Sequence, residues 1–193
     1  MKYRREFMSF EKEPNEVLFE GDYLRVVKKD GWETIERNNA SGVVIIYPIT
    51  NDDKLVLVEQ FRRPIGKACI EWPAGLVGDK PNNKDPEVAA KHELEEETGY
   101  RANTMRKVFS GTVSPGLSNE ITDCFIATNL EKISFGGGNK DEKENIKVHE
   151  VHIDDFEKWI KNKELSGIVI DIKVWLGYYV IVAKVFKGSL NID

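Results

Sequence analysis

Residues 92–100 have the sequence His92-Glu93-Leu94-Glu95-Glu96-Glu97-Thr98-Gly99-Tyr100, which places four glutamates within five positions. Like charges three or four residues apart on a helix repel one another, so a compensating cation is expected. At about 100° per residue, Glu93, Glu96 and Glu97 share one helix face, whereas Glu95 points away from them. Three converging carboxylates suit Mg²⁺ or Mn²⁺, which prefer oxygen ligands. A solvated acidic helix face is the alternative.

The helix that carries these glutamates is expected to span residues 86–98. Asp85 can accept hydrogen bonds from the first free N–H groups, and Pro86 fits the first turn. Gly99 can adopt the left-handed conformation that ends a helix. A polar loop, residues 78–85, precedes it, and three residues are expected to reach the core: Val88, Ala89 and Leu94.

Apolar runs bounded by turn residues predict strands on both sides of this helix. The expected strands are residues 42–49, 54–61, 69–72, 105–113, 120–128 and 147–153, and Pro73-Ala74-Gly75-Leu76 is expected to be a turn. Residues 168–186 have the apolar spacing of a core-packing helix. Glycines 136–138 precede a charged segment and are expected to form a flexible loop.

The N-terminal part predicts a small antiparallel sheet of two or three strands, formed from residues 16–20, 23–28 and 32–37 with a turn at Asp30-Gly31. So few strands are marginally stable alone and need something to pack against. We therefore expect an N-terminal β subdomain, residues 1–40, that serves dimerisation and substrate contacts, followed by a main domain, residues 41–193.

Composition excludes several classes of function. The net charge of −5 and the pI near 5.4 argue against nucleic-acid binding, which needs a basic face. No apolar run approaches the about 18 residues that a membrane span requires. Cys69 and Cys124 are far apart and lack the spacing of a zinc site or a disulfide framework. We expect a cytoplasmic protein with reduced thiols, without nucleic-acid or membrane partners.

Gly75 or Gly78, the pair Ala89-Ala90 and residues 92–100 together closely resemble the Nudix box. That resemblance implies the Nudix fold of α/β (α+β) class, a mixed β-sheet between helices. Residues 60–64, 71–76, 114–116 and 141–148 are similar to segments of the ADP-ribose pyrophosphatase branch. This wider similarity implies hydrolysis of ADP-ribose or a related nucleoside diphosphate sugar to a nucleoside monophosphate and a sugar phosphate.

The resemblance also implies roles for individual residues. Divalent metal, Mg²⁺ or alternatively Mn²⁺, is expected on the Ala74 carbonyl and on Glu93, Glu96, Glu97 and Glu144. Glu142 corresponds to the general base, assisted by the box residues Glu93 and Glu96. Glu120 or a box glutamate is the alternative base. A carboxylate of this kind would deprotonate water while bound cations stabilise the diphosphate charge.

Substrate contacts follow from the same resemblance. Arg62 is expected to bind the diphosphate and Arg37 a second phosphate or the ribose, because guanidinium groups pair well with phosphate; a surface salt bridge is the alternative for either. Tyr23 and Trp32 would stack on the base, with the N-terminal sheet coming from the partner subunit of a homodimer. Packing in the core or interface is the alternative for Tyr23. The remaining expected substrate-binding positions are Glu71, Pro115 and Gly116.

Two residues depart from the box. Lys84 occupies the position of its first glutamate and His92 that of its arginine, and the loop after Gly75 is about three residues longer than in close relatives. Histidine can make only one of the two hydrogen bonds that arginine offers. A catalytically weakened sensor that binds nucleotide sugars is therefore an alternative prediction. A GDP-mannose-type hydrolase is another, because nothing in Trp32 or Arg62 selects adenine over guanine.

Overall fold

The computed structural model describes residues 15–138 and 145–186. Its strands are β1 (Glu16–Glu20), β2 (Leu24–Lys29), β3 (Trp32–Arg37), β4 (Gly42–Pro48), β5 (Lys54–Arg62), β6 (Lys67–Glu71), β7 (Ala74–Val77), β8 (Tyr100–Gly111), β9 (Thr122–Lys132), β10 (Lys147–His152) and β11 (Val169–Ile170). Its helices are α1 (Pro86–Thr98), α2 (Phe156–Leu165) and α3 (Ile172–Phe186), and a 3-10 turn (Ile153–Asp155) precedes α2.

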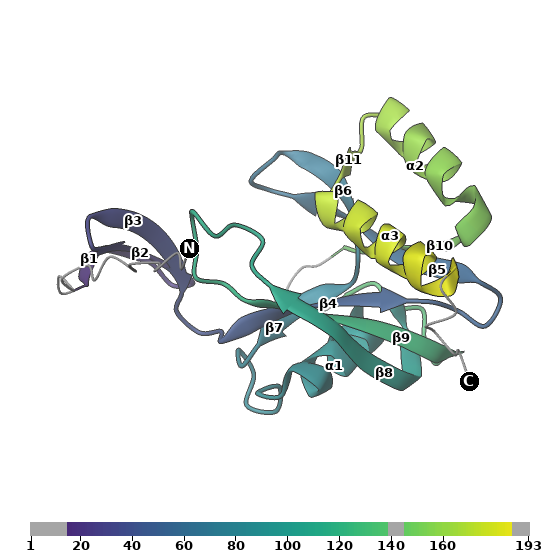
Figure 1. Cartoon of the computed structure of the whole chain (residues 1–193), viewed down its shortest axis with the longest axis horizontal. Coiled ribbons are helices and arrows are strands. Elements are labelled where there is room, and N and C mark those ends of the chain that lie inside the picture. Colours follow the sequence, from purple (N-terminus) through teal and green to yellow (C-terminus); the bar gives the residue numbers. More distant parts are fainter. Residues whose placement is uncertain (1–14, 139–144, 187–193) are drawn as a thin grey trace, which may run out of the picture.

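Two four-stranded sheets form the main body, with strand orders β7-β4-β9-β8 and β10-β5-β6-β11 (Figure 1). The pairs β4–β9 and β6–β11 are parallel and the others antiparallel, so both sheets are mixed. Helix α1 lies on one side of the body, and α2 and α3 lie on the other. The predicted mixed α and β architecture is confirmed, with the expected sheet divided into two.

The strand β4 shows why this sequence forms buried strands. Ile45 and Tyr47 point into a core under α2 and α3, whereas Val44 and Ile46 point into a second core against α1. Successive side chains of a strand face opposite ways, so a strand buried on both faces must be apolar throughout. The uninterrupted apolar run that predicted this strand is thereby explained.

Helix α1 begins and ends where its capping residues predict. The Asp85 side chain accepts hydrogen bonds from the backbone N–H groups of Glu87 and Val88. Gly99 is left-handed, with φ of 72°. The expectation for Val88 is wrong, because its side chain is 49% exposed, whereas Ala89 and Leu94 are buried as predicted. Alanine and leucine can fill the inner face of the helix as well as valine can. The apolar character of Val88 therefore did not determine which face of the helix packs against the core.

Two other local predictions need correction. Residues 73–76 were expected to be a turn, but Ala74–Val77 form β7, which pairs with β4 in antiparallel register. Residues 168–186 do not form one helix, because Val169–Ile170 pair in parallel with β6 before α3 begins. Both short strands lack the alternating pattern that marks longer ones, and pairing partners distant in sequence decide them.

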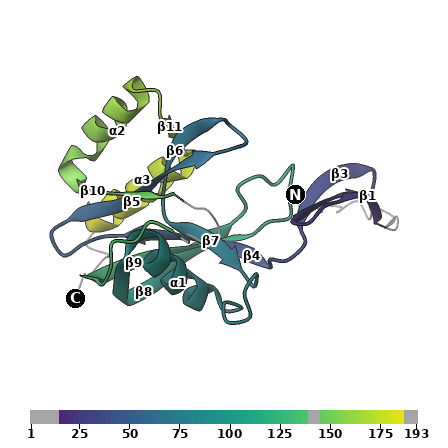
Figure 2. The same cartoon turned by 180° about the vertical axis from the view of Figure 1, so that it is seen from behind.

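The predicted small N-terminal sheet is present, has three strands in the order β1-β2-β3, and projects from the main body (Figures 1 and 2). It contacts the loop between β8 and β9, where the Ile35 N–H donates to the Leu117 carbonyl at 2.8 Å. The Trp32 indole N–H donates to the Gly116 carbonyl at 3.2 Å. Whether residues 1–40 act as a separate dimerisation subdomain stays a prediction.

The structure also bears on the predictions about membrane-spanning helices and about the two cysteines. In the part of the chain that the structure describes, no helix is both long enough and apolar enough to cross a membrane. Cys69 and Cys124 are buried free thiols, as predicted. Burial raises the pKa of Cys69 to about 12 and also raises that of Cys124, so both remain protonated thiols near neutral pH.

Candidate functional site: a two-signed cleft beside helix α1

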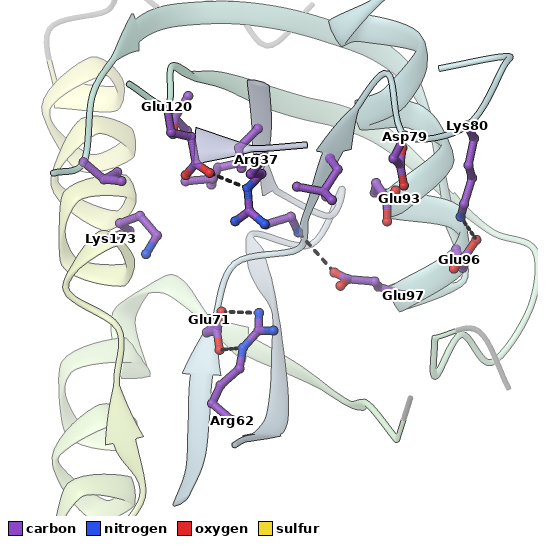
Figure 3. Close-up of a pocket in the computed structure, with 17 residues that line it drawn as sticks. Arg37, Arg62, Glu71, Asp79, Lys80, Glu93, Glu96, Glu97, Glu120 and Lys173 are labelled. Atoms are coloured by element: carbon purple, nitrogen blue, oxygen red, sulfur yellow. Dashed lines mark hydrogen bonds and ion pairs between the residues drawn. The ribbon is translucent and has the colours of Figure 1, made fainter. Parts of the chain in front are cut away.

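A cleft of about 400 Å³ opens where β7 and the second half of α1 meet the ends of β5 and β6. Its charged lining consists of the acidic residues Glu71, Asp79, Glu93, Glu96, Glu97 and Glu120 and the basic residues Arg37, Arg62, Lys80 and Lys173. Figure 3 shows the three α1 glutamates together on one side of the view, apart from Arg37 and Arg62. We call those three, Glu93, Glu96 and Glu97, the acidic wall.

Glu93 reaches the cleft across β7 at a position where only glycine fits. A Cβ on Gly75 would lie 2.2 Å from Glu93 Cδ, far inside van der Waals contact. The Glu93 residue is only 8% exposed, so its side chain is held between helix and strand. The glycine of the Pro73-Ala74-Gly75-Leu76 segment therefore creates the space for this carboxylate.

Glu97 is fixed by the same strand. Its Oε2 accepts a hydrogen bond from the Ala74 backbone N–H at 3.1 Å, and the residue is buried. Glu95 behaves differently: its carboxylate pairs with Arg101 outside the cleft, and that hydrogen bond lowers the pKa of Glu95. The division into three clustered glutamates and one outward glutamate agrees with the helical periodicity of the sequence.

Glu96 has two basic neighbours within 4 Å. Lys80 Nζ lies 3.6 Å from Glu96 Oε2, and His92 Nδ1 lies 3.7 Å from the same oxygen. His92 therefore approaches Glu96 one turn along α1, but at a distance longer than a hydrogen bond. Lys80 comes from the long loop before α1, and no motif or spacing in the sequence assigns it to the site.

The two arginines of the cleft are each paired with a carboxylate. Arg62 donates two hydrogen bonds to Glu71, at 2.6 and 2.7 Å, and this interaction raises the pKa of Arg62. Arg37 Nε donates to Glu120 Oε2 at 2.6 Å. Since a guanidinium has five N–H donors, both arginines retain donors beyond these pairs.

Four of the predicted substrate residues lie outside the cleft lining: Tyr23, Trp32, Pro115 and Gly116. Tyr23 and Trp32 are 78% and 64% exposed on the N-terminal sheet. Trp32 and Gly116 contact each other directly, which joins two of the predicted segments. The stacking role of the aromatic residues thus depends on a second subunit or on a substrate that extends out of the cleft.

The predicted late glutamates, Glu142 and Glu144, lie outside the described residues. The segment that leads to them starts beside the acidic wall, because the Gly137 and Gly138 N–H groups donate to the carbonyls of Glu97 and Glu96. These glycines therefore cap the end of α1, a role that the expectation of a flexible loop missed. Gly136, with φ of 68°, has its Cβ position 2.4 Å from the Thr98 carbonyl carbon.

Sequence reasoning also missed two charged cleft residues besides Lys80, namely Lys173 and Asp79. Lys173 comes from α3. The Trp72 indole N–H donates a hydrogen bond to the Lys173 carbonyl, and this bond connects α3 to the segment just before β7. Asp79 comes from the same loop as Lys80. The only available signal was the concentration of charged residues in that loop, which is common in solvated loops.

The oxygen donors of this cleft fit a hard divalent cation. The three carboxylates of the acidic wall line it, and Gly75 leaves the room that one of them, Glu93, needs. Within residues 15–138 and 145–186, however, no three Asp, Glu, His or Cys side chains converge closely enough to hold a metal ion by themselves. A complete coordination sphere would need further oxygens, such as the Ala74 carbonyl and Glu144.

Comparisons with known proteins agree with this geometry. The chain is 39% identical over 124 residues to the methanol dehydrogenase activator of Bacillus methanolicus, and 35% identical over 124 residues to the ADP-ribose pyrophosphatase of Bacillus subtilis. Each match covers 64% of this chain and 65% of the relative, so it spans just under two thirds of those proteins.

The fold is also that of a solved structure, an ADP compounds hydrolase, with a TM-score of 0.60 and 21% sequence identity. That likeness covers 76% of this chain and 82% of the other. The NUDIX domain profile matches residues 39–175, which is well over half of the chain and includes β4, the acidic wall and α3 up to Trp175. The chain therefore belongs to the Nudix family.

Proposed function

We propose that the protein hydrolyses the diphosphate bond of ADP-ribose or a related nucleoside diphosphate sugar. The observation that carries this proposal is a cleft with charges of both signs, in which the acidic wall and the arginines Arg37 and Arg62 line one cavity. Guanidinium groups bind phosphate oxygens, and clustered carboxylates attract divalent cations. The names of the Bacillus subtilis relative and of the solved hydrolase support the same substrate class.

Nudix hydrolases generally use divalent metal ions, and we propose Mg²⁺, with Mn²⁺ as a substitute. Glu93, Glu96, Glu97, the Ala74 carbonyl and Glu144 would hold it. A bound divalent ion would offset the charge of the diphosphate and lower the pKa of water. Glu142 would accept the proton of the attacking water, and Glu120, which also lines the cleft, is the alternative base.

Arg62 would orient the diphosphate. Its Nε and Nη2 atoms are bound by Glu71, which leaves the remaining N–H donors at Nη1 and Nη2 for phosphate oxygens. Because Glu71 is only 8% exposed, it holds the guanidinium in one orientation before substrate binds. Arg37, paired with Glu120, would contact the second phosphate or the ribose.

The nucleobase would stack on Tyr23 and Trp32, and we propose that a homodimer brings the N-terminal sheet of one subunit to the cleft of the other. Stacking does not distinguish adenine from guanine, so GDP-mannose and related sugars are the alternative substrates. Gel filtration with light scattering checks the shared site, because a monomer in solution would contradict it. We also propose that the protein acts in the cytoplasm, where its two thiols stay reduced.

A panel of nucleoside diphosphate sugars with Mg²⁺ tests the enzymatic function. Phosphatase treatment of the products releases inorganic phosphate only after the diphosphate bond is cleaved, which gives a simple readout. We expect turnover of ADP-ribose, a large loss in Glu97→Gln and near-normal turnover in Glu95→Gln, since Glu95 faces away from the cleft. Binding without turnover of any member of the panel would instead favour the nucleotide-sugar sensor, for which His92 and Lys84 are the supporting departures.

A further inference from the structure

The loop between β7 and α1 is folded around one buried amide. Asn83 is only 4% exposed. Its Oδ1 accepts hydrogen bonds from the backbone N–H groups of Gly78 and Lys80, both at 3.0 Å. Its Nδ2 donates to the Leu76 carbonyl at 3.0 Å and to the Asp79 carboxylate. The buried side chain therefore fixes the backbone at Lys80 and ties the loop to the end of β7.

This loop brings Lys80 to the acidic wall. The Lys80 side chain is 34% exposed, and its ammonium lies 3.6 Å from the Glu96 carboxylate. That separation is a charge contact rather than a tight hydrogen bond. The ammonium of a lysine is a compact charge that persists at neutral pH. Lys80 thus places a positive charge beside Glu96, one of the three carboxylates of the acidic wall.

We propose that Lys80 is a built-in counter-cation of the acidic wall, which offsets the repulsion among its carboxylates and thereby weakens its affinity for divalent metal. The proposal deepens the proposed function, because it concerns the same cleft and rests on the acidic wall being the metal site. Two opposing interactions decide whether Lys80 strengthens or weakens the binding of a divalent metal. Lys80 attracts Glu96 at 3.6 Å, but it would repel a divalent cation bound to the same carboxylate.

The matched variants are Lys80→Met and Lys84→Met. Both remove one positive charge from the same loop, but Lys84 is exposed and does not line the cleft. Mg²⁺ affinity is measured by isothermal titration of the full, substrate-free protein with MgCl₂ at constant pH and ionic strength. We expect Lys80→Met to bind Mg²⁺ about threefold or more tightly than the wild type, because a partly exposed charge still contributes at this distance. Lys84→Met and Lys80→Arg should stay close to the wild-type affinity.

Three results would overturn the proposal: unchanged or weaker Mg²⁺ binding in Lys80→Met, an equal gain in Lys84→Met, or no Mg²⁺ binding by any of these proteins. Asn83→Ala adds a variant with no change in charge. If a thermal melt shows it folded, its Mg²⁺ affinity should rise as well, since Lys80 is then no longer fixed beside Glu96. If it does not fold, the Lys80 and Lys84 pair decides alone.

The outcome is separable from that of the hydrolysis assay. A protein that cleaves ADP-ribose but shows no affinity difference between the two methionine variants would retain the proposed function and lose the role of Lys80. A protein that shows the affinity difference but cleaves none of the nucleotide sugars would lose the proposed function and retain the counter-cation.

Discussion

Arg62 and Glu71 form a two-point ion pair between the adjacent strands β5 and β6. Arg62 Nε lies 2.6 Å from Glu71 Oε1, and Arg62 Nη2 lies 2.7 Å from Glu71 Oε2. This parallel geometry fixes the plane of the guanidinium as well as its position. Both side chains line the cleft, so the pair presents an oriented cation opposite the acidic wall. A lone surface salt bridge, the alternative expected for Arg62, would not need a nearly buried acid.

Arg62→Lys should weaken substrate binding although it keeps the charge. Lysine cannot form the two parallel hydrogen bonds to Glu71, so its ammonium is not held in one orientation. We expect KM for ADP-ribose to rise by about tenfold or more, with a smaller change in kcat, in steady-state assays at saturating Mg²⁺. Arg63→Lys is the control, because Arg63 is exposed and outside the cleft lining. Equal effects of the two substitutions would contradict the role of Arg62.

Gly75→Ala should displace Glu93 from the cleft. The added Cβ would lie 2.2 Å from Glu93 Cδ and 2.5 Å from its Oε1, so the carboxylate or β7 must move. We expect a loss of hydrolysis of about 100-fold and destabilisation of about 1–3 kcal/mol, the usual cost of overpacking. The matched control is Gly111→Ala, because a Cβ on Gly111 meets nothing within 4 Å. Activity assays and urea unfolding measure both quantities, and a fully active Gly75→Ala variant would show that Glu93 has space elsewhere.

The sequence predicted those features that depend on local chemistry. Asp85 and Gly99 mark the ends of α1 because capping needs only a side-chain oxygen and a left-handed residue at fixed positions. The division between the acidic wall and Glu95 follows from helical periodicity alone. Arg37, Arg62 and Glu71 line the same cleft as the acidic wall, and their role in substrate binding, which the resemblance to the Nudix pattern implies, stays a prediction.

Features that depend on distant partners could not be predicted in the same way. Lys80 enters the cleft because Asn83 is buried, and a buried asparagine in a polar loop has no distinguishing pattern. β7 exists because β4 offers it an edge, and Lys173 lies in the cleft because Trp72 packs on α3. The glycines after Phe135 were interpreted as flexible, yet their N–H groups satisfy the last carbonyls of α1.

Gly136→Ala should destabilise the end of α1. Its backbone has φ of 68°, and a Cβ there would lie 2.4 Å from the Thr98 carbonyl carbon and 2.6 Å from the Glu97 carbonyl oxygen. We expect a decrease in the free energy of unfolding of about 2 kcal/mol or more, measured by urea denaturation. Two effects contribute to this loss, the strain of positive φ and the close packing around the Cβ position. Gly31→Ala separates them, because Gly31 also has positive φ but its Cβ position is open. If the two variants lose the same stability, backbone strain alone explains the effect and close packing does not.

The buried cluster of Glu59, His149 and Lys163 should make stability depend on pH. Glu59 Oε2 lies 2.8 Å from both His149 Nε2 and Lys163 Nζ, and all three side chains are at least four-fifths buried. Burial lowers the pKa of His149 from its usual 6.5, Lys163 lowers it further, and Glu59 only partly opposes this. Burial alone would raise the pKa of Glu59, but hydrogen bonds from Lys163 and His149 lower it overall.

The direction in which His149 changes the free energy of unfolding with pH follows from its lowered pKa. The unfolded chain gains a proton on this histidine below pH of about 6.5, whereas the folded protein resists it. The stability contribution is therefore complete above pH 6.5 and is lost as the pH falls through the folded pKa. Glu59 acts in the same direction, but only below the ordinary glutamate pKa of 4.5. Between pH 7.5 and 5 the change thus reports His149 rather than Glu59.

Urea unfolding at pH 7.5 and pH 5 measures this change. We expect His149→Gln to be less stable than the wild type at pH 7.5, because it loses the edge contact with Trp159. It should nevertheless lose less stability on acidification than the wild type does, because it lacks the histidine that the unfolded chain protonates more readily than the folded protein. His152→Gln is the control for the loss of a histidine as such, because the His152 side chain is 43% exposed and lies outside the cluster of Glu59, His149 and Lys163. Identical pH dependence in wild type and His149→Gln would mean that the folded protein protonates His149 as readily as the unfolded chain does.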